Sequence, residues 1–153
     1  MRRWFLLVPL CLSTHVWADW SVRQASPKIA QQPACVLETE WRTVFDGYQD
    51  TQVQVIVSTG KVEARSKAPL DNGSLDISIK VDDKDQIKPD GIKGEKIAGF
   101  DTASALLVEQ FIKGKSLRLQ MRFWPTWPQT GVHVAEFTLI GFTKAHNEFL
   151  KCE

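Results

Sequence analysis

Residues 116–123 read SLRLQMRF, and this stretch decides the fold because apolar and polar side chains alternate along its whole length. The apolar positions are Leu117, Leu119, Met121 and Phe123. Strict alternation is typical of a strand with one buried face and one solvated face. A second alternating run follows at 135–139, and pairing Leu119 with Phe137 brings the two apolar faces together. The pattern therefore predicts an antiparallel hairpin.

Further strands are predicted upstream of this hairpin. Val53, Val55 and Val57 recur at every second position, and the spacing resumes over 62–64, which predicts a second hairpin with Val57 opposite Val62. Residues 75–81 alternate strictly after the turn sequence PLDNG, and residues 35–40 form another expected strand. The polar, Gly- and Lys-rich residues 82–99 predict a long turn or a short hairpin at a sheet edge.

Two segments have helical rather than strand spacing. Thr102–Lys113 is predicted as an amphipathic helix, with Asp101 as its N-cap and Gly114 at its end. A short closing helix is predicted beyond Gly141, where these residues recur at helical spacing: Phe142, Ala145, Phe149 and Cys152. We therefore expect a mainly β, sandwich-like fold of antiparallel sheets with one amphipathic helix and a short C-terminal helix. An α+β arrangement is the alternative.

Residues 1–18 have the pattern of a secretory signal peptide. Arg2 and Arg3 precede a short apolar run, and the small residue Ala18 marks the expected cleavage point. The run is too short to cross a bilayer, which takes about 20 residues. A lipid-anchored Cys11 is the alternative, although Leu10 is bulky for that motif. We expect a periplasmic or secreted protein without a membrane span, in which residues 19–153 form a single domain.

Loss of this leader changes both the charge and the number of cysteines. The chain carries 19 basic and 18 acidic residues, and removing two arginines changes the net charge from +1 to −1. A near-neutral domain is unsuited to nucleic acid or to polybasic membrane binding. Cys11 leaves with the leader, so Cys35 and Cys152 remain as an even pair in an oxidising compartment. We expect a disulfide between them, and two separate buried thiols are the alternative.

The tip of the hairpin formed by 116–123 and 135–139 carries the most unusual local sequence, WPTWPQTG at 124–131. Trp124 and Trp127 are candidate contacts for a partner or a glycan, because tryptophan is enriched at interaction hot spots. The alternative is that both rings fold back over the edge of the core. Arg118 and Arg122 lie on the polar face of the adjoining strand and form a second candidate contact surface, or simply a solvated sheet face.

No residue set carries a catalytic or metal-binding signature. The acidic residues of 82–90 are interspersed with lysines and lack the spacing of a calcium loop. His133 and His146 have no partner at metal-ligand spacing, and the two mature cysteines do not form a C-x-x-C pair. The nucleophile elbow G-x-S-x-G is absent from the sequence. We therefore expect no catalytic residues, no metal and no cofactor.

The second half of the chain resembles a known family. Residues 106–117, LLVEQFIKGKSL, and 138–145, TLIGFTKA, are similar to the invasion-associated locus B family of exported bacterial envelope proteins. The likeness covers most of 19–153, but only the last fifty residues are specific. Members usually carry further cysteines, which this chain lacks, and Cys152 is more similar to the end of periplasmic accessory proteins of type VI secretion. The resemblance implies no established catalytic residues.

The expected function is therefore non-enzymatic. We expect a periplasmic or envelope protein that binds or stabilises a protein partner, or that serves as a subunit of a larger envelope assembly. The alternative is a small-ligand-binding protein, a glycan-binding protein or a hydrolase, with a site assembled from residues that are scattered in the sequence.

Overall fold

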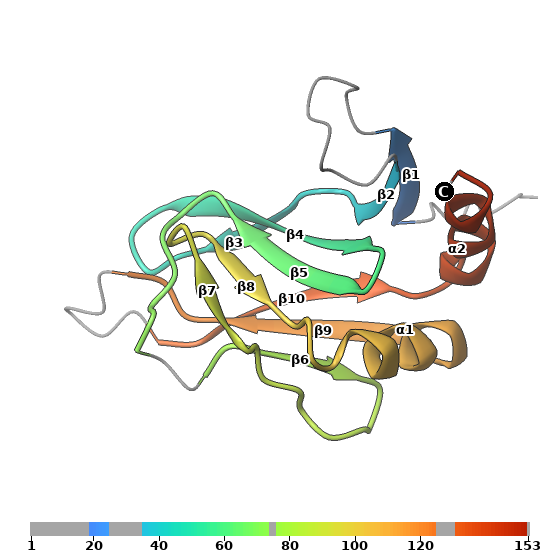
Figure 1. Ribbon diagram of the computed structural model, residues 1–153. Coiled ribbons are helices and arrows are strands. Elements are labelled where there is room, and N and C mark those ends of the chain that lie inside the picture. Colours follow the sequence, from blue (N-terminus) through green and yellow to red (C-terminus); the bar gives the residue numbers. More distant parts are fainter. Residues whose placement is uncertain (1–18, 25–34, 74–75, 125–130, 153) are drawn as a thin grey trace, which may run out of the picture.

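The computed structural model describes residues 19–24, 35–73, 76–124 and 131–152, and within these ranges the strands form two antiparallel sheets (Figure 1). The larger sheet has the order β1-β2-β4-β5-β8-β7, with β3 also paired to β4. Its strands are β1 (Trp20–Gln24), β2 (Cys35–Thr39), β3 (Arg42–Phe45), β4 (Asp50–Ser58), β5 (Lys61–Ser66), β7 (Gly91–Lys93) and β8 (Ile97–Gly99). The smaller sheet has the order β10-β9-β6, from β6 (Ser78–Val81), β9 (Ser116–Met121) and β10 (His133–Thr138). The predicted mainly β fold is confirmed.

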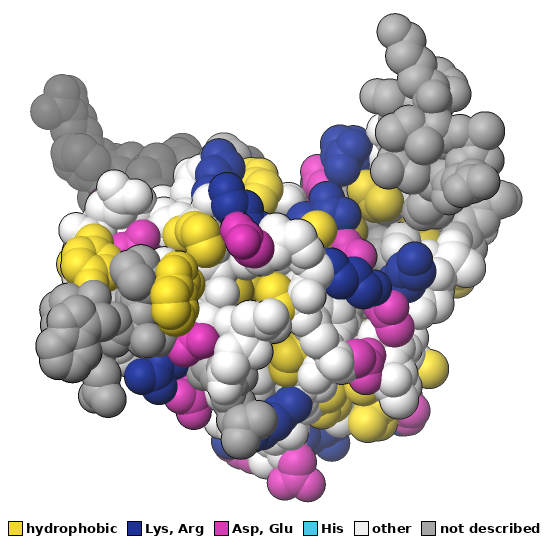
Figure 2. Space-filling view, turned by 60° about the vertical axis from the view of Figure 1, so that its left-hand side comes forward, with side chains coloured by type: hydrophobic (Ala, Val, Ile, Leu, Met, Phe, Trp, Pro, Cys, Tyr) yellow, Lys and Arg dark blue, Asp and Glu magenta, His cyan; other side chains and the backbone are white. Residues whose placement is uncertain are grey.

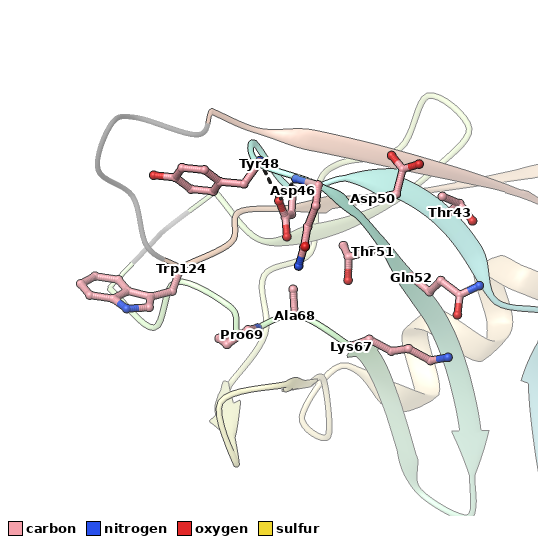
Figure 3. Close-up of a pocket in the computed structure, with 11 residues that line it drawn as sticks. Thr43, Asp46, Tyr48, Asp50, Thr51, Gln52, Lys67, Ala68, Pro69 and Trp124 are labelled. Carbon is pink, nitrogen blue, oxygen red and sulfur yellow. Dashed lines mark hydrogen bonds between the residues drawn. The ribbon is translucent and has the colours of Figure 1, made fainter.

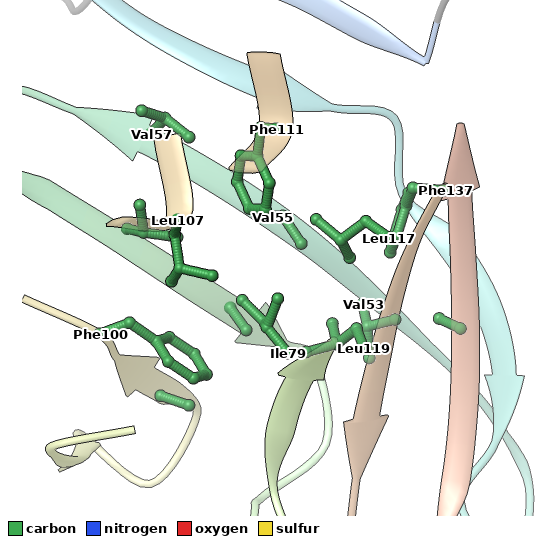
Figure 4. Packing of buried hydrophobic residues seen from close by; sticks show 14 of the residues in the cluster. Val53, Val55, Val57, Ile79, Phe100, Leu107, Phe111, Leu117, Leu119 and Phe137 are labelled. Carbon is green, nitrogen blue, oxygen red and sulfur yellow. The ribbon is translucent and has the colours of Figure 1, made fainter. Parts of the chain in front are cut away.

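The two helices lie together at one end of the molecule, and the loops at 46–49, 67–73 and beside Trp124 lie at the other end (Figure 1). α1 (Ser104–Lys113) and α2 (Phe142–Leu150) are both amphipathic. Figure 4 shows Leu107 and Phe111 of α1 packed over the valines of β4, beside the apolar side chains of β6 and β9. The core therefore lies between the sheets and is closed by α1.

The hairpin of β4 and β5 has the predicted register. Val57 pairs with Val62 and Val55 pairs with Ala64, and all four side chains are buried. The polar stretch 82–99 contains the short hairpin β7–β8, which extends the larger sheet beyond β5. Each reversal contains a glycine at positive φ, Gly60 at 66° and Gly94 at 55°, which is a conformation that glycine accepts more readily than other residues.

The β9–β10 hairpin forms as predicted, but its register is shifted by two residues. Leu119 pairs with Ala135 rather than with Phe137, and Phe137 pairs with Leu117. A shift of two leaves every side chain on its original face, so the apolar pattern does not distinguish the two registers. The observed register places Arg118 directly opposite Glu136, with 3.2 Å between Nε and Oε1. It thereby brings opposite charges face to face.

The predicted helix boundaries are nearly correct, but the predicted cap is wrong. α1 begins at Ser104 instead of Thr102, and no side chain caps it. The Asp101 carboxylate instead accepts a hydrogen bond from the Lys93 ammonium at 3.0 Å. The Thr102 N–H, just before the helix, donates to the Asp90 carboxylate at 2.9 Å. The carboxylate that binds the backbone at this end therefore comes from a neighbouring loop and not from Asp101.

Three predicted strands begin or end at different residues in the structure. The strand expected at 35–40 ends at Thr39, and the one expected at 75–81 begins at Ser78, with Ile77 buried just before it. Leu75 lies outside the described residues. The strand expected to reach Phe123 ends at Met121, because Phe123 instead forms an isolated bridge with Leu70.

The two ends of the described chain are joined by covalent and polar contacts. The predicted disulfide is present, and it links Cys35 of β2 to Cys152 just after α2, with 6.0 Å between the Cα atoms. The Trp20 indole N–H donates to the Thr138 carbonyl at 2.9 Å, and the ring lies edge-on against Phe142 at 4.8 Å. α2 is thus held against β1 and β2.

Residues 1–18, which include the predicted signal peptide, lie outside the described residues. In the part of the chain that is described, no helix is long and apolar enough to cross a membrane.

Candidate binding site at the aromatic end

The end of the molecule opposite the helices exposes several large apolar side chains. We call it the aromatic end, and we define it by four residues with their exposed fractions: Phe45 (51%), Tyr48 (51%), Trp124 (59%) and Val132 (42%). Hydrophobic side chains gather on this side in the space-filling view (Figure 2). Such a gathering on a soluble domain is typical of a binding surface.

Trp124 stands at the end of the strand-like segment that continues from β9. Its backbone N–H donates to the Pro69 carbonyl at 2.9 Å, and two residues earlier the Arg122 carbonyl accepts the Asp71 N–H at 2.9 Å. The preceding Phe123 is buried and bridges Leu70. Hydrogen bonds therefore hold the backbone at Arg122 and at the Trp124 N–H, while the Trp124 side chain is exposed.

Trp127, the other tryptophan of the predicted contact, lies outside the described residues.

Tyr48 lies in the tight turn between β3 and β4. The buried Asp46 begins this turn, and its Oδ1 accepts the N–H groups of Tyr48 at 2.8 Å and Gln49 at 2.9 Å. The Asp46 N–H donates to the Gln49 carbonyl at 2.9 Å, and Gly47 has a φ of 105° that favours glycine. These bonds fix the turn and hold Tyr48 at the surface.

A pocket of about 690 Å³ opens between these two segments (Figure 3). Tyr48 and Trp124 lie on opposite sides of its outer rim, and Ala68 and Pro69 form part of its wall. The remaining lining side chains all carry hydrogen-bonding groups: Thr43, Asp46, Gln49, Asp50, Thr51, Gln52 and Lys67. The Lys67 ammonium lies 5.0 Å from the centre of the ring of Trp41, and Trp41 itself does not line the pocket. The pocket therefore combines aromatic rims with a polar interior.

A second hollow of about 430 Å³ lies on the other side of Trp124. Trp124 and Pro69 line both hollows, so together they form a shared wall. The other residues of the second hollow are Leu70, Asp71, Asn72, Gly73, Ile92 and Glu95. The exposed indole thus stands between two depressions of the surface.

The two arginines proposed as contact residues lie in different surroundings. Arg118 is about half exposed, pairs with Glu136, and lines a separate hollow between β3 and β10. Arg122 is only 21% exposed, and its Nη1 lies 2.7 Å from an oxygen of Asp76. Its Nε also lies 3.8 Å from Asp71, which lines the second hollow. Only Arg122 therefore adjoins the aromatic end.

The two described histidines pack against aromatic rings. His133 lies 6.2 Å from the Phe45 ring and 5.9 Å from the Phe123 ring, measured between ring centroids. His146 stacks on Phe142 at 5.6 Å. These contacts give both imidazoles a packing role.

The acidic stretch at 82–90 supports the backbone around it. Hydrogen bonds from the Ser116 and Lys115 N–H groups, the former with the larger effect, hold the pKa of Asp82 below its usual value. The Thr102 N–H likewise lowers the pKa of Asp90. Within the described ranges, no group of three or more His, Cys, Asp or Glu side chains is placed to hold a metal ion.

The sequence predicted Trp124 but not its partners in the pocket. Tyr48 is the only tyrosine of the chain and follows an Asp-Gly pair between two alternating runs, which is a turn signal. Gln49 and Lys67 carry no comparable signal. They line the same pocket as Trp124 because the β3–β4 turn and the segment after β5 both lie near the end of β9.

Comparison with known proteins found no match to this chain among family models, curated proteins or solved structures. The resemblance to the invasion-associated locus B family therefore stays a prediction from the sequence.

Proposed function

We propose that this chain is a non-enzymatic binding protein of the bacterial envelope that holds its partner at the aromatic end. The observation that carries the proposal is the exposure of Trp124 and Tyr48 on backbone segments that hydrogen bonds fix in place. Exposing two large aromatic rings is unfavourable in water unless a partner covers them. Because the backbone is already ordered, binding costs little conformational entropy.

The state of the acids in the pocket supports binding over catalysis. Asp46 is the most buried carboxylate in the lining, and its Oδ1 is occupied by two backbone N–H groups of the turn. Asp50, the other lining carboxylate, is exposed. Catalytic acids and bases are usually found with a charged or hydrogen-bonded side-chain partner that tunes them. A structural role explains Asp46 without such a partner.

The disulfide supports an exported location. Bonds of this kind persist in oxidising compartments and are rare in the cytosol. Cys35 and Cys152 pair with each other, and they are the two cysteines that would remain if residues 1–18 were removed.

A sedimentation assay with the envelope fraction of the source cells tests the proposal. The purified protein should pellet with the envelope, and the double variant Trp124→Ala, Tyr48→Ala should bind at least about tenfold more weakly. A matched control is Ile140→Ala, Leu150→Ala, because those residues are exposed by 59% and 53% and lie at the helical end. Equal pelleting of the two double variants would contradict a contact at the aromatic end.

A further inference from the structure

Trp124 separates two hollows, and this arrangement suits an elongated ligand. The exposed indole and Pro69 form the wall that both hollows share, and each hollow is open to solvent. A ligand with repeating units can place one unit in each hollow while it crosses the indole edge. A single compact group would occupy only one of them.

The interior of the larger hollow is polar where a protein anchor would be apolar. Figure 3 shows Asp46 and Thr51 further inside the hollow than the Tyr48 and Trp124 rings, and Gln49 belongs to the same lining. An apolar side chain inserted there would cover these groups without replacing their hydrogen bonds to water, which costs free energy. The occupant must therefore offer several donors and acceptors together with an apolar face.

The charges of the two hollows restrict the ligand further. The first hollow is lined by the carboxylates of Asp46 and Asp50, and the second by those of Asp71 and Glu95. Lys67 is the only cationic residue among the lining residues of the two hollows, and its ammonium lies over the Trp41 ring. Arg122 pairs with Asp71 from outside the lining, but the lining residues of each hollow carry net negative charge, which is unfavourable for an anionic ligand.

From these three constraints, and resting on the proposed function, we infer that the ligand at the aromatic end is an uncharged oligosaccharide. A pyranose has a face of C–H bonds that can lie against the Trp124 indole, whose face is electron-rich. Its hydroxyl groups both donate and accept, as the Gln49 amide and the Thr51 hydroxyl require. Aromatic walls with a few placed polar groups are the usual composition of small-molecule sites.

An NMR titration with defined sugars tests this inference. The probes are three neutral hexasaccharides, built from β-1,4-linked N-acetylglucosamine, β-1,4-linked glucose and α-1,4-linked glucose, and one acidic comparator, hexagalacturonate. At least one neutral probe should shift the Trp124 indole N–H and the Gln49 side-chain amide, with a Kd below about 1 mM. Its affinity should exceed that of its own monosaccharide, because the ligand spans both hollows.

Variants separate stacking from general destabilisation. Trp124→Ala and Gln49→Ala should each weaken binding by about tenfold while the melting temperature stays unchanged, because both side chains are exposed. Ile140→Ala, which removes an equally exposed side chain at the other end, should leave binding unchanged.

The outcomes distinguish this inference from the proposed function. If no neutral hexasaccharide shifts these signals, or if hexagalacturonate binds as tightly, the oligosaccharide is wrong. Trp124-dependent pelleting with the envelope would then still stand and would indicate a partner of another class. If Trp124-dependent pelleting is absent as well, both proposals fail.

Discussion

Replacing Cys35 and Cys152 together by alanine is expected to lower the free energy of unfolding by about 4–5 kcal/mol. The bond joins positions 117 residues apart, and cross-linking a loop of that length removes chain entropy from the unfolded state of about this size. Alanine is the suitable replacement because Cys35 is fully buried, and a serine there would bury an additional hydroxyl group.

The double variant should still fold at room temperature. The Trp20 indole would keep its hydrogen bond to Thr138 and its edge-on contact with Phe142, so α2 stays docked on β1 without the bond. A domain of this size typically has 5–15 kcal/mol of stability, and a loss of 4–5 kcal/mol leaves the folded state favoured when the starting value lies in the upper part of that range.

Urea unfolding followed by circular dichroism measures the difference. The oxidised wild-type protein is compared with the double variant and with wild-type protein in excess reductant, and the last two should agree. The slope of unfolding free energy against urea should be larger without the bond, because the unfolded chain then exposes more surface. A difference below about 1 kcal/mol between oxidised protein and double variant would refute the loop-entropy argument.

Two further predictions concern the segment that links α1 to β9. Gly114→Ala should destabilise the protein by about 1–3 kcal/mol, because an added Cβ would lie 2.5 Å from Val81 Cγ1 and 2.8 Å from the Gln110 carbonyl. Gly91→Ala, with nothing within 4 Å, is the matched control in the same urea assay and should change stability by less than about 0.5 kcal/mol. Asp82→Asn should lower the melting temperature at pH 7, because the ionised carboxylate accepts the Ser116 and Lys115 N–H groups. The pKa of Asp82 is lowered by folding, so its stabilisation is complete above the unfolded pKa of about 3.9 and is lost as the pH falls through the folded value. The difference in melting temperature between wild type and Asp82→Asn should therefore shrink below about pH 4, and a constant difference would argue against this role.

Side-chain alternation predicted which residues face the core, because that property depends only on a period of two. It did not predict the register of β9 and β10, since both candidate registers bury the same apolar set. The observed register sets Arg118 opposite Glu136, but both side chains are more than half exposed and such a pair contributes little, so the register depends on the connecting turn as well.

The predicted cap at Asp101 failed for a related reason. Asp101 has the residue type and the position of a helix cap, but Lys93, from the β7–β8 hairpin, holds its carboxylate. Local propensity is a weak prior where a charged group from elsewhere competes for the same atoms.

Only one part of the candidate site was predictable from the sequence. Trp124 is a tryptophan next to turn residues, which marked it as a candidate contact, whereas Tyr48 and Gln49 come from a turn far earlier in the chain. They share a pocket because β3 and β4 place their connecting turn at the same end of the sandwich as the end of β9. That proximity is a consequence of sheet topology and has no signal in any short stretch of sequence.

The bond between Cys35 and Cys152 also sets an order of events when the protein is made. Synthesis runs from the N-terminus, and Cys152 lies 117 positions after Cys35. The Cys35 thiol therefore has no partner until nearly the whole chain has been made. Until then Cys35 is open to mixed disulfides with small thiols or with other proteins. Formation of the disulfide-bonded protein therefore depends on the rate of oxidation as well as on the rate of folding, and a thiol-reactive probe added during synthesis should label Cys35 before the bond forms.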